Sequence, residues 1–250
     1  VVTVVAGFWS CYPAATVAPA APPSPQSGKS ARVIWLHGLG DTAAGWGFLP
    51  RYLVARGGFD HVDFMLPTAP TIPITVNSGM AMPGWFDMAD LPYSPSSRDD
   101  RSSIEAIGVS QLSALIEASE ADGFPADRIV VGGFSQGGCV ATLAGLRHPR
   151  ALAGVASLSG WVPHYAREDA AEVIAASAGG VQRPLPPMLW GHGEADPTVT
   201  FEAAKAGLPV LQAAGVEVDF KSFPGLGHSA GEDELEWLAE WLQARLPAQP

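Results

Sequence analysis

Three residues that are far apart in the chain, Ser135, Asp196 and His228, have the types and the order that nucleophilic catalysis by serine requires. A serine hydroxyl is a weak nucleophile unless a base removes its proton, and a third group usually orients that base. Ser135 lies in Gly133-Phe134-Ser135-Gln136-Gly137, a G-x-S-x-G pattern that holds a serine on a sharp turn between a strand and a helix. The chemistry expected is attack of the serine oxygen on a carbonyl carbon.

Each of these residues also has a purely structural alternative. Ser135 could cap a helix after a glycine-rich turn, Asp196 could cap the helix that follows Pro197, and His228 could be an ordinary loop histidine. Glu194 is a rival acid. The rival bases are His37, His61, His148, His164 and His192. None of them follows the last predicted strand, where the order serine, acid, histidine places the base, so we predict Ser135, Asp196 and His228 as the catalytic set.

A serine nucleophile of this kind also needs two N–H donors for the oxyanion that forms during the reaction. One donor is the backbone N–H of the residue after the nucleophile, here Gln136. The other comes from an early glycine-rich loop, here His37-Gly38-Leu39-Gly40-Asp41, in which the Leu39 N–H is our candidate. The alternative for this loop is a glycine turn with no chemical role.

Composition excludes several other classes of function. The 250 residues carry a net charge of −11, which argues against nucleic acid or an anionic membrane surface as a partner. No apolar run approaches the ~20 residues of a spanning helix, so we predict no integral membrane segment. No spacing typical of metal ligands appears, and we predict neither a metal nor another cofactor.

Short apolar runs alternate with helical periods from Arg32 onward. The predicted strands are 33–36, 62–66, 129–131, 152–158, 188–190 and 216–223, and the predicted helices are 43–56, 101–121, 136–147, 199–214 and 232–245. Most of the strand runs are continuously apolar, as in parallel sheets that are covered on both faces. The fold class predicted is therefore α/β, with a mostly parallel central sheet, helices on both faces and the ligand site at the carboxyl ends of the strands.

Two connections are longer than such folds usually need, residues 67–100 and 160–186. Connections beyond ~12–15 residues are commonly functional, as lids or binding loops, or disordered. The first connection carries several large apolar side chains: Met80, Met82, Trp85, Phe86 and Met88. That composition is too apolar for disorder, so we expect this segment to line a hydrophobic substrate pocket.

The first thirty residues differ from the rest, because they are rich in Pro and Ala and contain no acidic residue. We divide the chain into an N-terminal arm or linker over 1–30, which could be the remnant of a targeting segment, and a catalytic domain over 31–250. The two cysteines, Cys11 and Cys139, form no disulfide framework. A reducing compartment, the cytoplasm, is expected, or an organelle if residues 1–30 direct the protein there. Cys139 should be small core filler.

Several motifs together identify a family. These motifs are His37-Gly38-Leu39-Gly40-Asp41-Thr42, Pro67-Thr68-Ala69-Pro70, Met82-Pro83-Gly84-Trp85-Phe86-Asp87, Gly132 to Gly138 and Gly227-His228-Ser229. From about residue 31 to about residue 246, the chain that carries them resembles the acyl-protein thioesterase / carboxylesterase (phospholipase/carboxylesterase) family of the α/β-hydrolase fold. The resemblance implies the same triad and oxyanion donors, and it places Trp85 near the site. Residues 1–30 and 160–186 match the family poorly.

The resemblance implies hydrolysis of acyl thioesters and esters by a serine enzyme. The family's activities include depalmitoylation of proteins and removal of acyl chains from lysophospholipids, so the expected partners are acylated proteins or lipid esters. We expect a monomer or a weak homodimer. A short-chain carboxylesterase of small metabolites is the main alternative, and a non-catalytic receptor for hydrophobic ligands on the same fold is the other.

Overall fold

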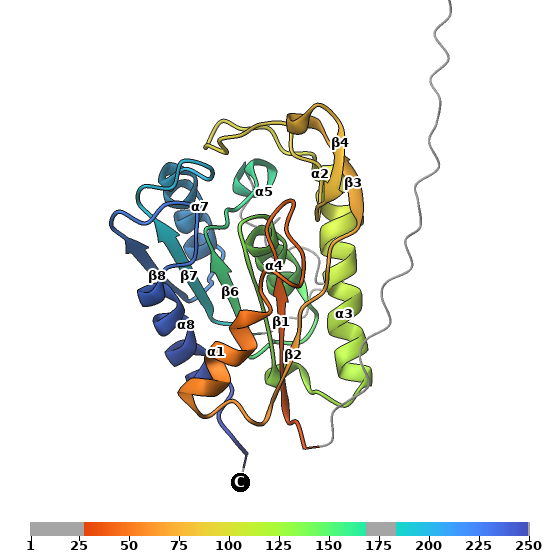
Figure 1. Ribbon diagram of the computed structural model, residues 1–250, viewed down its shortest axis with the longest axis vertical. Helices are drawn as coiled ribbons and strands as arrows, with labels where there is room; N and C mark the ends of the chain where they lie inside the picture. The colour runs from red at the N-terminus through yellow and green to blue at the C-terminus, as the bar shows by residue number, and fades with distance from the viewer. Residues whose placement is uncertain (1–27, 169–183, 250) are drawn as a thin grey trace, which may run out of the picture.

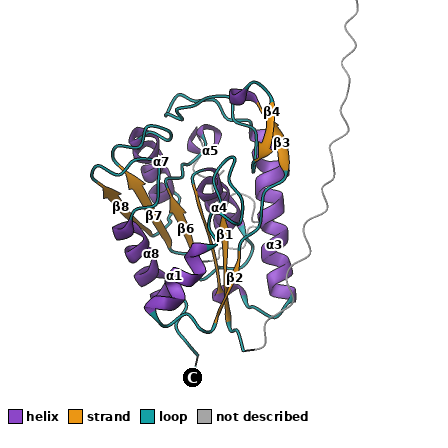
Figure 2. Ribbon diagram, in the orientation of Figure 1, coloured by secondary structure: helices purple, strands orange, loops and turns teal. Residues whose placement is uncertain are grey.

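A six-stranded parallel sheet forms the centre of the protein in the computed structural model, which describes residues 28–168 and 184–249. Its strand order is β2-β1-β5-β6-β7-β8, and every neighbouring pair is parallel (Figures 1 and 2). The strands are β1 (Ala31–Leu36), β2 (Val62–Met65), β5 (Ile129–Phe134), β6 (Gly154–Leu158), β7 (Met188–Gly193) and β8 (Val218–Phe223). All six predicted strands are present, and the α/β class is confirmed.

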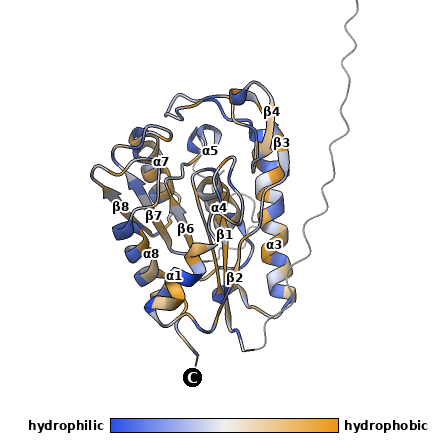
Figure 3. Cartoon of the chain, viewed as in Figure 1, coloured by the Kyte–Doolittle hydropathy of each residue, from blue (hydrophilic) through white to orange (hydrophobic). Residues whose placement is uncertain are grey.

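Helices cover both faces of the sheet. One face is covered by η2 (Ile104–Val109), α3 (Ser110–Ala121), α4 (Gln136–Arg147), α5 (His164–Glu168) and α7 (Phe201–Ala213), and the other by α1 (Phe48–Arg56) and α8 (Glu232–Arg245). Apolar and polar residues alternate along α1 and α3, as expected for helices with one buried side (Figure 3). The strands between these layers have fully buried side chains, such as Val33 and Ile34 of β1 on its two faces.

The helix predicted over 101–121 is one continuous segment of three parts. It begins with α2 (Arg101–Ser103), where the Asp100 side chain accepts the Ser102 and Ser103 N–H groups as an N-cap, and it continues through η2, a π-helical turn, into α3. Gly108 lies in the π-helical turn, and a Cβ there would lie 3.0 Å from the Trp85 carbonyl oxygen. This helix therefore packs directly beneath the apolar 67–100 connection.

Two local features differ in detail from the prediction. The helix expected from residue 43 begins only at Phe48, because residues 43–47 form turns. A Cβ on Gly45 would overlap the Asp41 carboxylate, so the chain folds back on itself at this point. The second difference is an antiparallel hairpin of β3 (Thr71–Ile74) and β4 (Met80–Pro83) inside the 67–100 connection, joined by η1 (Thr75–Asn77).

The strand order creates a natural place for a ligand. After β1 the chain continues to β2, which lies on one side of β1. After β5, which pairs with β1 on its other side, the chain continues to β6, which lies farther out on that side. The loops after β1 and β5 therefore leave the sheet in opposite directions at its carboxyl edge, and such a switch point leaves a crevice. Ser135 and the glycine-rich loop with Leu39 both lie at this point.

Parts of the predicted organisation lie outside the described residues. Of the predicted arm over 1–30, only residues 28–30 are described, and there the Ser30 N–H donates to the His61 carbonyl at 2.8 Å. The 160–186 connection contains α5, and its residues 169–183 are not described. Within the described ranges, no helix is both long enough and apolar enough to cross a bilayer.

Candidate active site

Ser135 occupies a sharp turn between β5 and α4. Its backbone has φ 55° and ψ −120°, a conformation that costs energy for any residue with a Cβ. The turn is possible because its neighbours lack side chains: a Cβ on Gly133 would lie 2.5 Å from the Gly137 carbonyl carbon. The Ser135 N–H donates to the Leu158 carbonyl of β6 at 2.8 Å, which holds the turn over the sheet. The G-x-S-x-G pattern thus presents the hydroxyl above the carboxyl edge of the strands.

One continuous chain of hydrogen bonds joins the three predicted catalytic side chains. His228 Nε2 lies 3.0 Å from Ser135 Oγ, and His228 Nδ1 lies 2.7 Å from Asp196 Oδ2. The second oxygen of Asp196 accepts the backbone N–H groups of Thr198 and Val199 at 2.8 and 2.9 Å. Asp196 and His228 follow β7 and β8, so three strand ends supply the set. The arrangement can move a proton from the serine to the imidazole while the carboxylate fixes the ring.

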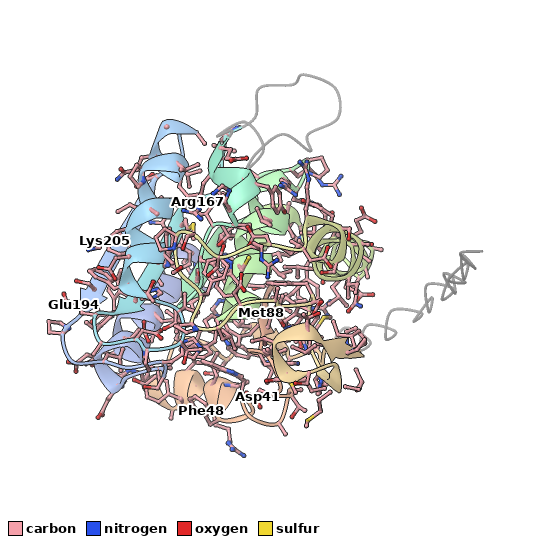
Figure 4. The ribbon with its side chains drawn as sticks, turned by 90° about the horizontal axis from the view of Figure 1, so that it is seen from above. Asp41, Phe48, Met88, Arg167, Glu194 and Lys205 are labelled. Atoms are coloured by element: carbon pink, nitrogen blue, oxygen red, sulfur yellow. The ribbon has the colours of Figure 1, made fainter. Side chains whose placement is uncertain are left out.

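The Asp196 carboxylate is held in its ionised form. Burial acts to raise its pKa, but the hydrogen bond and the charge of His228 and the N–H groups of Val199 and Thr198 outweigh burial, so the pKa lies below its ordinary value. Asp196 is 6 % exposed. The rival acid Glu194 is exposed and accepts a hydrogen bond from Ser222 Oγ at 2.7 Å instead. Figure 4 places Glu194 at the margin of the face that carries the site.

The nearest rival base, His192, has a different partner. Its Nε2 donates to the Val199 carbonyl at 2.9 Å and lies 3.7 Å from Asp196 Oδ2. Burial lowers its pKa, so the ring is neutral. Three other rival histidines have partners elsewhere: His61 Nε2 donates to the Leu246 carbonyl, and His148 and His164 lie within ion-pair distance of Glu120 and Glu168. Among the described residues, His228 is the one histidine that reaches Ser135 Oγ.

His37 fixes the loop that carries the Leu39 amide. Its Nε2 accepts the Ala69 N–H at 3.0 Å, so its Nδ1 carries the proton and donates to the Gly38 carbonyl at 2.6 Å. Burial lowers the pKa of His37, which keeps this neutral tautomer. The backbone of His37 is also held by Trp85, whose indole Nε1–H donates to the His37 carbonyl at 2.8 Å. This role for His37 had no separate signal in the sequence beyond its place before the glycines.

The two predicted oxyanion donors flank the serine. A Cβ on Gly38 would lie 3.3 Å from Ser135 Cβ, so the loop with Leu39 packs on Ser135. Gln136 is the first residue of α4, where helix N–H groups lack partners and the helix dipole favours negative charge. Neither the Leu39 nor the Gln136 N–H has a protein acceptor within the part of the chain that the structure describes. Both amides are therefore able to bind a ligand oxygen.

A cavity of 300 Å³ opens beside Ser135 and His228. Its apolar wall is formed by Leu39, Met82, Met88, Leu91 and Phe134, and its polar wall by Asp41, Asn77 and Thr198. Figure 4, which looks down on the carboxyl edge of the sheet, shows Met88 near the middle of this face and Asp41 toward one side. The cavity fits an apolar chain that is attached to a carbonyl group at Ser135.

The expected pocket residues divide into three groups. Met82 lines the cavity, whereas Trp85 and Phe86 are buried behind its wall, with exposures of 0 and 2 %. Met80 is 65 % exposed at the hairpin. Trp85 and Phe86 differ from the expectation because the Gln136 side chain binds their backbone: Trp85 N–H donates to Gln136 Oε1 and Gln136 Nε2 donates to the Phe86 carbonyl, each at 2.7 Å.

Leu91 and Thr198 are pocket residues that the sequence analysis did not identify. They are brought together by the segment around Tyr93, whose N–H donates to the Thr198 carbonyl at 2.7 Å and whose carbonyl accepts the Thr200 N–H at 2.9 Å. This pairing joins the pocket wall to the loop that carries Asp196. The only signal in the sequence was the length of the 67–100 connection.

Metal or thiol chemistry has no support in the described residues. Within them, no group of three His, Cys, Asp or Glu side chains could hold a metal ion. Cys139 is fully buried in α4, and burial raises the pKa of its thiol, so it serves as packing. Cys11 lies outside the described residues.

Comparisons with known proteins point in the same direction as this geometry. A family model described as Phospholipase/Carboxylesterase matches residues 20–246. Acyl-protein thioesterase 1 of Gibberella zeae is 39 % identical over 223 residues, which cover 88 % of this chain and 93 % of that protein. Carboxylesterase SOBER1 of Arabidopsis thaliana is 36 % identical over 215 residues, which cover 86 % of this chain and 90 % of that protein.

Solved structures show the same fold. The crystal structure of Arabidopsis thaliana SOBER1 matches with a TM-score of 0.77 at 35 % identity and covers 86 % of this chain and 99 % of that one. The crystal structure of Zea mays acyl-protein thioesterase 2 matches with a TM-score of 0.71 at 28 % identity and covers 89 % of this chain and 96 % of that one. The likeness therefore extends over most of the chain.

Proposed function

Because the chain belongs to the phospholipase/carboxylesterase family, we propose that this ester and thioester hydrolase works through an acyl-enzyme on Ser135. The observation that carries the proposal is the aligned chain from Ser135 Oγ through the His228 ring to Asp196, with distances of 3.0 and 2.7 Å, at the edge of an apolar cavity. A serine, a base and an orienting acid in hydrogen-bond contact are what nucleophilic catalysis requires.

In the first half of the reaction, Ser135 Oγ attacks the carbonyl carbon and its proton passes to His228 Nε2. The resulting oxyanion accepts the Leu39 and Gln136 N–H groups, each of which is worth ~3–4 kcal/mol in such sites. Asp196 stabilises the imidazolium that forms. His228 then gives its proton to the departing oxygen or sulfur. An alcohol or thiol leaves, and the acyl group stays on Ser135.

In the second half, water takes the place of the leaving group. His228 removes a proton from the water as its oxygen attacks the acyl carbonyl, and the same two amides bind the second oxyanion. The proton returns to Ser135 Oγ as the ester bond breaks, which releases a carboxylic acid and restores the enzyme. Atoms and charge balance over the cycle without a cofactor.

The acyl chain occupies the cavity lined by Leu39, Met82, Met88 and Leu91. Burial of an apolar chain there contributes ~0.8 kcal/mol per CH₂. Acyl groups on protein cysteines or on lysolipids are the substrate class that we favour, since relatives carry the name acyl-protein thioesterase. Depalmitoylation and lipid metabolism follow from that substrate class. The cytoplasm and a monomeric or weakly dimeric state remain our predictions from the sequence.

A short-chain carboxylesterase is the second candidate, and one observation favours it. The cavity of 300 Å³ is at the lower end of the ~300–1,000 Å³ typical of small-molecule sites. A long acyl chain would fill it and continue over the exposed side chain of Leu91, whereas a short chain would fit inside.

A matched series of acyl thioesters and esters from two to sixteen carbons tests the proposal, with Ser135→Ala as the control. We expect kcat/KM to rise with chain length and to be abolished by the substitution. A maximum at two to four carbons would favour the short-chain esterase. Full activity of Ser135→Ala would overturn the proposal itself.

A further inference from the structure

Glu234 is a fully buried acidic residue that the reaction does not use. It lies in the first turn of α8 and is 0 % exposed, whereas its neighbours Glu232 and Asp233 are exposed. Neither of its carboxyl oxygens has a hydrogen-bond partner within the described part of the chain. Buried carboxyl groups are normally paired, so this one calls for an explanation.

One side of the Glu234 carboxyl group rests on the backbone of β7. A Cβ added to Gly191 would lie 3.2 Å from Glu234 Cδ and closer still to Glu234 Oε1. Only glycine leaves room for the carboxyl group at this position. Because β7 leads directly into the turn that carries Asp196, the Glu234 side chain packs against the base of that turn.

The other side of Glu234 faces the segment that follows His228. Gly231 caps α8 and accepts the Leu235 N–H at 2.9 Å, and it is joined to His228 by only two residues. The Gly231 N–H lowers the pKa of Glu234 without reaching hydrogen-bond geometry. The carboxyl group therefore lies between the strand that leads to Asp196 and the segment that leads away from His228.

The two loops above Glu234 are joined to each other. The Ala195 N–H donates to the Leu226 carbonyl at 3.0 Å, and a Cβ on Gly193 would lie 2.8 Å from the Gly227 carbonyl oxygen. The Asp196 turn and the His228 loop are thus held together at the level of the site. The Glu234 side chain contacts β7 just before the first of these loops, at Gly191.

The surroundings of Glu234 favour its protonated form. Burial, together with the negative charge of Asp196, outweighs the Gly231 amide and raises the pKa of Glu234 to about 8. Among the described residues, Asp196 is the titratable side chain whose charge acts on it. The protonated carboxyl group therefore fills its space without placing a second negative charge beside the Asp196–His228 pair.

We propose that Glu234 is a positioning residue, whose carboxyl group is wedged between Gly191 and Gly231 and sets the distance between Asp196 and His228. The inference rests on the proposed role of those two residues in the reaction. It predicts that the shape of the side chain matters for turnover and that its charge does not. A residue that serves only to cap α8 would affect stability alone.

Kinetics of two variants separate shape from charge. Glu234→Ala should lower kcat about 10- to 100-fold with little change in KM, because small displacements of catalytic groups have effects of this size. Glu234→Gln keeps the shape of the side chain but cannot carry a negative charge, and it should recover most of the kcat that Glu234→Ala loses. Leu238→Ala, one turn further along α8 and equally buried, is the matched control for a loss of packing alone, and its kcat should stay within about twofold. All rates are referred to active sites counted by a fluorophosphonate, which removes any unfolded fraction.

A second measurement does not depend on activity. The low-field proton resonance of His228 Nδ1 reports the 2.7 Å contact with Asp196. At one fixed pH, its position should change in Glu234→Ala and should stay close to the wild-type position in Glu234→Gln and in Glu232→Gln. Equal kcat losses in Glu234→Ala and Leu238→Ala, or an unchanged resonance in Glu234→Ala, would overturn the inference. Failure of the proposed function would appear separately, as undiminished activity of Ser135→Ala.

Discussion

The Gln136 side chain and the backbone of Trp85 and Phe86 form a closed pair of hydrogen bonds next to Ser135. Gln136 Oε1 accepts the Trp85 N–H, and Gln136 Nε2 donates to the carbonyl of the next residue, each at 2.7 Å. Gln136 also supplies one of the two proposed oxyanion donors through its backbone. The same residue therefore serves the reaction centre and anchors the apolar 84–88 segment over it.

Gln136→Ala should leave the backbone donor in place and release that segment. Two buried backbone groups would lose their partners, at about 1–3 kcal/mol each, so we expect the free energy of unfolding to fall by about 2–6 kcal/mol. Urea unfolding measures this change. Gln212→Ala removes an exposed glutamine from α7 and should change stability by less than about 0.5 kcal/mol. Equal stability of the two variants would show that the pair of contacts contributes nothing.

Trp85 should affect turnover rather than substrate binding, since it lies behind the cavity wall. Trp85→Phe keeps an aromatic ring but loses the indole N–H that donates to the His37 carbonyl at 2.8 Å. The loop with the Leu39 amide would lose this support, and we expect kcat to fall about tenfold with KM nearly unchanged. Steady-state kinetics on one acyl thioester test this. A change confined to KM would instead mean that Trp85 contacts the acyl chain.

Asp196→Asn should remove the charge that supports the His228 imidazolium and the acceptor that fixes its tautomer. The expected loss in kcat is about 10⁴-fold, as for the same change in serine proteases. Binding of a substrate analogue should be retained. A loss smaller than tenfold would mean that another group orients His228.

Asp196 also predicts a dependence of stability on pH. Its pKa is lower in the folded protein than in the unfolded chain, so its contribution is fully present above the unfolded value of ~3.9 and is lost as pH falls through the folded value. The difference in unfolding free energy between the wild type and Asp196→Asn should therefore shrink as the pH drops below about 4. Thermal unfolding at several pH values measures this difference. A difference that grows as the pH falls would contradict a lowered pKa of Asp196 in the folded protein.

Met82 should control the length of the acyl chain that the cavity accepts. Met82→Trp would fill part of the space, so the rise of kcat/KM with chain length, up to about fourfold per CH₂, should stop at shorter chains. Met80→Trp, two residues earlier on β4 and 65 % exposed in the wild type, is the matched control and should keep the wild-type profile. Identical profiles for both variants would place the acyl chain elsewhere.

The sheet and the reacting residues could be predicted because their causes are local. Continuous apolar runs such as 129–131 mark buried parallel strands, and Gly133 and Gly137 mark a turn that no other residue fits. The order of Ser135, Asp196 and His228 then follows from topology. Their hydrogen-bond chain is a property of the structure, and their chemical roles remain the proposal made above.

The features that could not be predicted from the sequence depend on contacts between residues that are far apart in the chain. The β3–β4 hairpin has Pro73 and Pro83 within its strands, and proline in an apolar run argues against a strand unless the strand lies at an edge. Trp85 was expected in the pocket because it is apolar, but hydrogen bonds from its indole and its backbone turn it inward. Nothing in the sequence distinguishes Glu234 from the acids next to it, Glu232 and Asp233, and the contact with Gly191 appears only in the structure.

The central claim is that the acyl group is carried by Ser135. Mass spectrometry of the intact protein and its peptides, quenched during turnover of an activated ester, tests it most directly. The account predicts one added acyl mass on the peptide that contains Ser135, and no adduct and no turnover in Ser135→Ala. An adduct on another residue, or steady turnover by Ser135→Ala, would contradict it.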